Sequence, residues 1–172
     1  MMMTMPHFFI ILTAVAGCVH DLYSRRIPNY VTFGSALLAL GYGVVNGGWA
    51  GFGVALAGWM LGVALFLPFF ALRGMGAGDV KLLAALGAWI GPIALFSLTF
   101  YTAMAGGVMA LVVILWQRKL ASTFRNIWLL LCHWRVAGVK PLAELTLENK
   151  NAPRLAYGLP IAVGAMVTIW LH

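Results

Sequence analysis

The chain carries little charge, and acidic residues are especially scarce. Of its 172 residues only 9% are charged, whereas 63% are hydrophobic. An average soluble domain is about a quarter charged and about half apolar. A water-soluble fold of this size cannot bury so much apolar surface, so the composition favours lipid as the solvent. We therefore predict one all-α, polytopic membrane domain over residues 1–172.

Patterns that would hold a metal or a cofactor are also missing. The two cysteines, Cys18 and Cys132, lie far apart in apolar stretches and form no CxxC pair. We interpret them as small buried hydrophobic residues. The sequence has no HExxH zinc motif and no phosphate-binding loop ending in Gly-Lys-Ser/Thr. We therefore expect neither a metal nor another cofactor.

The first twenty residues contain no Lys or Arg, although a secretory signal peptide begins with basic residues. We predict a retained membrane helix there, with a cleaved signal as the alternative. A membrane helix needs about 20 mostly apolar residues. On this basis the chain is expected to have about six spans, near residues 2–20, 29–45, 49–72, 80–95, 97–117 and 156–171, and a cytoplasmic loop near 118–155.

The number of spans depends on the uncharged stretch between Lys81 and Arg118. As one straight helix it would measure about 54 Å, too long for one crossing of a core about 30 Å thick. Gly91-Pro92 offers a break, with a re-entrant segment as the alternative to two crossings. Two crossings place all eleven Lys and Arg on one side, which the positive-inside rule makes cytoplasmic. Both termini are then expected outside the cytoplasm.

The net charge of +7 follows from this topology and requires no nucleic acid, for which no binding motif is present. Residues 118–134 combine basic side chains with Phe124, Ile127, Trp128 and Leu131 at helical spacing. This pattern predicts a basic helix on the inner membrane surface that binds anionic lipid. A docking surface for a protein partner is the alternative.

The four acidic residues divide into two pairs. Glu144 and Glu148 lie in the long loop and are expected to be solvated. Asp21 follows the first predicted span and Asp79 precedes the fourth, so both should lie at the cytoplasmic interface at similar depth. Acids at membrane depth are costly and are functional candidates. The alternative is that each caps a helix or pairs with a nearby Arg or Lys.

The sequence around each aspartate gives it a specific setting. Glycines at positions 74, 76 and 78 leave room beside Asp79, and Ile27-Pro28-Asn29 forms a turn after Asp21. Two carboxylates that share one proton can activate water, because the ionised partner accepts a proton while the neutral partner polarises a carbonyl. Asp21 and Asp79 are therefore candidates for a catalytic pair that activates water. His20 is interpreted as a bystander, with tuning of Asp21 as the alternative.

The segment from Gly76 to Leu82, Gly-Ala-Gly-Asp-Val-Lys-Leu, resembles the second aspartate motif of the type IV prepilin peptidases, membrane aspartyl proteases of the Gly-x-Gly-Asp type. Asp21 with its downstream Ile-Pro-Asn turn resembles the first motif. The resemblance implies a catalytic pair, Asp21 and Asp79, supported by Gly76, Gly78, Lys81, Ile27, Pro28 and Asn29. Tyr157-Gly158 loosely resembles the opening of the family's last helix, and no role is assigned to either residue.

The resemblance also implies a biological setting. Members lie in the bacterial cytoplasmic membrane and cut the basic leader of prepilins and pseudopilins at its cytoplasmic face, after a glycine and before the substrate's hydrophobic helix. Larger members carry a domain with paired cysteines and methylate the new amino terminus. This chain resembles the short form of tight-adherence (Flp) pilus systems, and methylation by it is not expected. No oligomeric state is predicted.

Two functions without catalysis remain as alternatives. A small ion transporter could bind cations at the membrane-edge acids, and it predicts ion flux without proteolysis. An assembly factor of a pilus or secretion complex could keep the fold without activity, and it predicts that Asp→Asn variants still support assembly.

Overall fold

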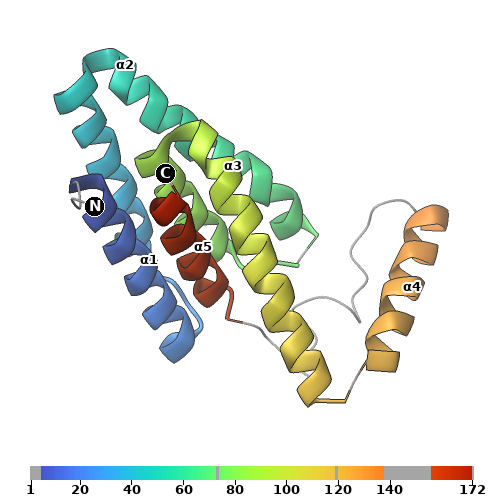
Figure 1. Ribbon diagram of the computed structural model, residues 1–172. Coiled ribbons are helices and arrows are strands. Elements are labelled where there is room, and N and C mark those ends of the chain that lie inside the picture. The colour runs from blue at the N-terminus through green and yellow to red at the C-terminus, as the bar shows by residue number, and fades with distance from the viewer. Residues whose placement is uncertain (1–4, 73, 119, 138–155, 172) are drawn as a thin grey trace.

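The computed structural model describes residues 5–72, 74–118, 120–137 and 156–171 (Figure 1). These residues form helices and no strand, which confirms the predicted all-α class. The helices are α1 (Met5–Ser24), α2 (Asn29–Ala71), α3 (Ala77–Trp116), α4 (Leu120–Ala137) and α5 (Gly158–Leu171). By length and composition α1, α2 and α3 can each cross a membrane, and α5 is a shorter apolar helix. This is the composition of a polytopic membrane protein.

Both long helices, α2 and α3, fold back on themselves at a glycine (Figure 1). Gly48 interrupts α2 with φ 57° and ψ −144°, and Gly91 interrupts α3 with φ 77° and ψ 173°. These backbone angles are readily adopted only by glycine. Pro92 then opens the second half of α3, a position where its missing N–H costs nothing. The reversals expected between the spans 29–45 and 49–72 and at Gly91-Pro92 are therefore present.

Three helix boundaries differ from the prediction. α1 continues to Ser24 instead of ending near residue 20, α3 begins at Ala77 instead of residue 80, and its first half ends at the predicted Gly91-Pro92 break and not at the predicted span limit of 95. Hydropathy marks where apolar residues stop, whereas a helix ends where its backbone groups find other partners. Arg25, with φ 51°, donates its N–H to the Asp21 carbonyl oxygen at 2.9 Å and ends α1. Both acids therefore lie inside helical turns.

The first half of α3 is the centre of the fold. α3 contacts α2, α5 and α1, and in its first half Leu82, Leu83 and Leu86 are 0% exposed. Small residues allow α2 to approach it closely, because a Cβ added at Gly62 would lie 2.7 Å from the Cα of Ala84. This central helix fixes the position of Asp79 in its first turn.

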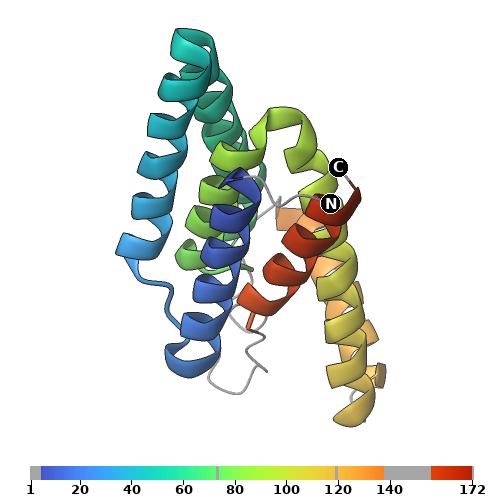
Figure 2. The ribbon, with the colours of Figure 1, turned by 60° about the vertical axis from the view of Figure 1, so that its left-hand side comes forward.

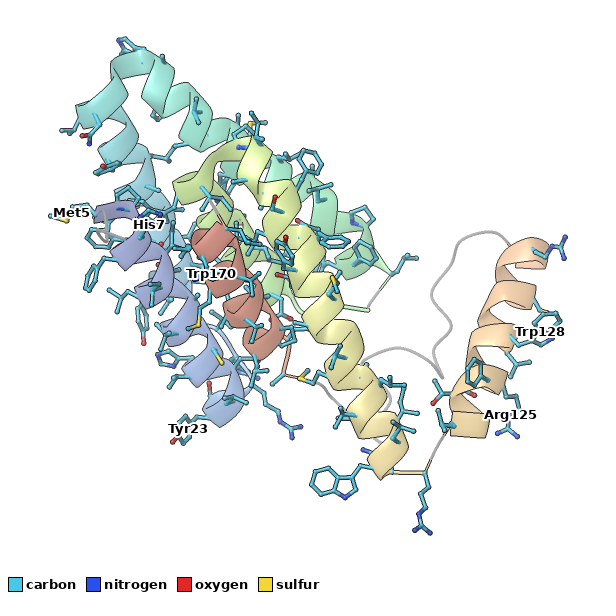
Figure 3. All side chains as sticks on the ribbon, in the orientation of Figure 1. Met5, His7, Tyr23, Arg125, Trp128 and Trp170 are labelled. Carbon is cyan, nitrogen blue, oxygen red and sulfur yellow. The ribbon has the colours of Figure 1, made fainter. Side chains whose placement is uncertain are left out.

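The packing of α1 and α5 determines which residues gather at the two ends of the bundle. α5 lies between α1 and the second half of α3 (Figure 2). The described ends of the chain lie at the same end of the bundle (Figures 1 and 2). Met5 and Tyr23 mark the opposite ends of α1 (Figure 3). The last turn of α1, which contains Asp21, is therefore at the end away from the termini.

The helix predicted over residues 118–134 is present as α4, shifted towards residue 137. α4 stands apart from the bundle (Figure 1), and its Arg125 and Trp128 project on the side facing away from the other helices (Figure 3). Phe124 and Trp128 are 70% and 68% exposed. The side chains of Ile127 and Leu131, together with Glu144 and Glu148, fall outside the described part of the chain, and the lipid contact of α4 stays a prediction.

Candidate active site

Asp21 is held by a residue far away in the sequence. It lies in the last turn of α1 and is 9% exposed. The end of a helix carries partial negative charge and disfavours an anion. The Oδ2 atom of Asp21 instead accepts a hydrogen bond of 2.8 Å from the backbone N–H of Gly158, which lies 137 positions away. Since Gly158 opens α5, the carboxylate meets the positive end of a second helix.

Gly158 leaves no room for a side chain. A Cβ at this position would lie 2.9 Å from the Cβ of Asp21 and 3.0 Å from the Cα of Cys18. Both neighbours belong to α1, and one of them is backbone that cannot turn aside. The packing of α5 against α1 and the placement of Asp21 therefore depend on the same contact.

Asp79 is held by a residue close in the sequence. It lies in the first turn of α3, is 8% exposed, and its Oδ2 accepts the N–H of Gly76 at 3.3 Å. Its own N–H donates to the Gly76 carbonyl oxygen at 3.2 Å. This reciprocal pairing resembles half of a capping box, and it keeps the anion at the positive end of its own helix. The predicted role of Gly76 as a supporting residue has a local structural basis.

The two predicted motifs pack against each other. Gly78 faces Ile27, because a Cβ on the glycine would lie 3.2 Å from the Cβ of Ile27. The Nζ atom of Lys81 donates to Oδ1 of Asn29 at 3.0 Å and lies 5.4 Å from the centre of the Phe33 ring. Contacts between side chains thus connect the start of α2 to the start of α3, beside the acid that α3 carries.

Pro28 and Gly76 occupy equivalent places before their helices. Pro28 precedes α2 with φ −65° and ψ 144°, and Gly76 precedes α3 with φ −75° and ψ 148°. Both are extended backbone conformations, which suit the residue that comes directly before a helix. The structure places Ile27 against Gly78 and Asn29 against Lys81, and the supporting role of these residues stays a prediction.

The start of α5 lies close to both carboxylates, because Gly158 binds Asp21 and the preceding Tyr157 interacts with Asp79. Asp21 and Asp79 are close enough to interact electrostatically, and so are Tyr157 and Asp79. Tyr157 precedes Gly158, the residue that binds Asp21, so one turn of chain contacts the surroundings of both acids. Two like charges that interact in this way disfavour double ionisation. The sharing of one proton by the two carboxyl groups stays a prediction.

His20 and Lys81 interact with residues other than the acids. The Nε2 atom of His20 lies 3.1 Å from the hydroxyl of Tyr30, which favours the interpretation of this histidine as a bystander to Asp21. The ammonium group of Lys81 bonds to Asn29. The alternative that Lys81 pairs with Asp79 therefore finds no support in the described contacts.

The fold and the site define a class: a helical membrane protein with a buried pair of carboxylates at one end of its bundle. Residues 8–111, which include both aspartate motifs, match the type IV leader peptidase family. The chain belongs to this family, which confirms the resemblance found in the sequence. It is an integral membrane protein of the bacterial inner membrane.

Curated relatives agree with the family match. A prepilin leader peptidase/N-methyltransferase of Aeromonas hydrophila is 35% identical over 119 residues, which are 65% of this chain and 41% of that protein. One of Pectobacterium carotovorum subsp. carotovorum is 31% identical over 112 residues, 61% of this chain and 38% of that protein. The chain thus spans about two fifths of the length of these relatives. No solved structure matches it significantly.

Sequence reasoning missed the part played by Gly158 and Tyr157. Both were noted for their resemblance to a helix opening, but their partners could not be read from that pattern. The available signal was a glycine at the start of an apolar segment that begins at the same end of the bundle as Asp21. A helix start without a capping side chain offers its N–H groups to any nearby acid.

Proposed function

We propose that this protein is a prepilin leader peptidase that cleaves the basic leader of type IV or Flp-type prepilins and pseudopilins at the cytoplasmic membrane face. The observation that carries the proposal is the pair of buried aspartates from separate motifs, each held by a backbone N–H at a helix start. The family match supports the choice of substrate, and so do the printed names of the relatives.

The chemistry follows from one proton shared by Asp21 and Asp79. The ionised carboxylate removes a proton from water as the water oxygen attacks the scissile carbonyl carbon. The neutral carboxyl group donates its proton to the carbonyl oxygen, which gives a tetrahedral diol. The carboxyl group that took the water proton then gives it to the leaving nitrogen as the C–N bond breaks. The other carboxylate accepts a proton from a diol hydroxyl, which becomes the carbonyl of the carboxylic acid product. The acids thereby return to the singly protonated state.

The test is removal of each acid in turn. A prepilin is co-expressed with the wild-type protein, with Asp21→Asn or with Asp79→Asn, and leader removal is followed by the shift in prepilin mass. Both variants are expected to leave the leader attached while accumulating in the membrane at the wild-type level. Unimpaired leader removal by either variant would contradict the assignment of Asp21 and Asp79 as the catalytic pair. Continued pilus assembly without leader removal would favour the assembly-factor alternative.

We also propose an orientation: six crossings, with residues 118–155 in the cytoplasm and both termini outside it. The reversals at Gly48 and Gly91 support it, as does the gathering of the described chain ends at the end of the bundle away from Asp21 (Figure 2). Reporter fusions at residues 47 and 140 are expected to report opposite sides of the membrane. Finding both on one side would contradict six crossings.

A further inference from the structure

A cavity of about 280 Å³ lies beside the carboxylates, between the later parts of α2 and α3. Phe66 and Phe69 of α2 form one wall, and the second half of α3 forms the other. Phe66 is 7% exposed and Phe69 is 56% exposed, so the aromatic wall runs from the protein interior to its lipid-facing surface. The lining is almost wholly apolar, which suits a hydrophobic occupant.

The wall formed by α3 is made of small residues. Ala103, Gly106, Gly107 and Ala110 all line the cavity, and their spacing of three and four places them on one helical face. Small residues of this kind allow a second helix to approach the backbone closely in a membrane. A Cβ at Gly107 would have nothing within 4 Å, so this glycine borders open space and not another part of the chain.

Two of the lining residues are next to the residues that bind the acids. Tyr157 lines the cavity and directly precedes Gly158, whose N–H binds the Asp21 carboxylate. Met75, another lining residue, directly precedes Gly76, whose N–H binds the Asp79 carboxylate. At the back of the cavity, against α5, Thr102 is 4% exposed, and its hydroxyl has no hydrogen-bond partner among the described residues. A hydrophobic segment seated here therefore has one end beside the two acids.

We infer that this cavity docks the apolar helix of the prepilin, on the far side of the scissile bond from the basic leader, and that Gly107 determines how closely that helix can approach. The inference rests on the proposed function. Because the cavity lies next to the carboxylates, its occupant should carry a peptide bond that the acids cleave. The prepilin meets this requirement, whereas an acyl chain or a second copy of this protein does not.

The first experiment fills the open space without touching the protein's own packing. Gly107→Leu is compared with Gly53→Leu, a matched control on α2, because both glycines are exposed and a Cβ at either would have nothing within 4 Å. The leucine improves helix propensity at both positions, so neither variant is expected to unfold at a lower temperature. For Gly107→Leu we expect KM for a full-length prepilin to rise at least tenfold, and for Gly53→Leu no change. Equal kinetics in the two variants would overturn the docking site.

The second experiment detects the contact without any catalysis. In an Asp79→Asn background with Cys18 and Cys132 replaced by alanine, Gly107→Cys or Gly53→Cys is oxidised with a set of prepilins that each carry one cysteine along the apolar helix. We expect a disulfide from Gly107→Cys to prepilin positions three or four residues apart, and none from Gly53→Cys. Linkage of Gly107→Cys to a second copy of the protein, or to no prepilin position, would overturn the inference.

The two proposals can fail separately. If the wild-type protein removes the leader but Gly107→Cys does not link to the prepilin, the docking site is wrong and the peptidase stands. If the prepilin links at Gly107→Cys but the wild-type protein never removes its leader, the docking site stands and the proposed function fails.

Discussion

The two aspartates have similar burial but opposite structural origins. Asp79 sits at the start of its own helix and is held by Gly76, three residues earlier. Asp21 sits at the end of its own helix, where the dipole disfavours an anion, and is held by Gly158, 137 positions later. The same kind of contact, a backbone N–H at a helix start, is therefore supplied once by local folding and once by the packing of α5 on α1.

The difference determines what each acid is sensitive to. The setting of Asp79 forms together with the first turn of α3 and depends little on the rest of the protein. The setting of Asp21 exists only when α5 is docked, because nothing on α1 replaces the N–H of Gly158. We therefore expect changes at the packing between α1 and α5 to affect Asp21 selectively.

The largest effect is expected when either aspartate is replaced, and these variants test whether both acids act in one reaction. Asp21→Asn and Asp79→Asn are each expected to lower kcat/KM for a prepilin by at least about 10³-fold, because neither acid can share the proton alone. The double variant is expected to be no slower than either single variant, since residues that act as a unit are not additive. The measurement is quantitative cleavage by purified protein. Losses that multiply in the double variant would mean that the acids act independently.

Gly158→Ala tests the long-range setting. The added Cβ would lie 3.0 Å from the Cα of Cys18 and 2.9 Å from the Cβ of Asp21, so α5 must shift and draw its N–H away from the carboxylate. We expect a loss of about 1–3 kcal/mol in stability from overpacking. We also expect about a hundredfold loss of cleavage, the usual cost of a misplacement near 1 Å.

Gly164→Ala is the matched control for that variant. It overpacks the same helix against Thr102 of α3, where the added Cβ would lie 2.7 Å from a backbone nitrogen, but it touches neither acid. Its kcat per folded molecule is expected to remain near the wild-type value. It is measured below the melting temperature of both variants and at saturating prepilin, because Thr102 also lines the proposed docking cavity. Equal specific activity of the two variants would show that the contact to Asp21 matters only for stability.

Gly76→Ala tests the local setting and is expected to have a smaller effect. The new Cβ would lie 3.1 Å from Oδ2 of Asp79 and near no backbone atom, so the end of the side chain can move by a few tenths of an ångström. The φ of −75° is also open to alanine. We expect cleavage to fall by less than about tenfold. A loss as large as that of Gly158→Ala would remove the distinction between the two settings.

The same distinction explains what the sequence could predict. The breaks at Gly48 and Gly91 and the placement of Asp79 beside a glycine-rich turn are local, so the residues around them determine them. Asp21 contacts Gly158, and Lys81 contacts Asn29. The members of each pair are far apart in the sequence, and no local pattern indicates that they are close in space. Hydropathy also placed Asp21 after its helix, because it detects the apolar span and not the capping that extends α1 to Ser24.

The smallest expected effect concerns Lys81, which the sequence left between two roles: it either stabilises the charged form of Asp79 or merely satisfies the positive-inside rule. Its Nζ bonds to Asn29 and lies over the Phe33 ring, so it connects α3 to α2 and does not reach the acid. Lys81→Met should therefore cost about 0.5–1.5 kcal/mol, the net value of one hydrogen bond.

The Lys81→Met variant should also change cleavage by less than about twofold at every pH, because its shape is kept and the protonation of the acids is untouched. Asn29→Ala, which removes the same bond but keeps the charge, is the control and should behave alike. A pH profile that shifts in Lys81→Met but not in Asn29→Ala would show that the charge of Lys81 acts on the acids. In that case the protonation of Asp79 would depend on Lys81 as well as on the contact with Gly76.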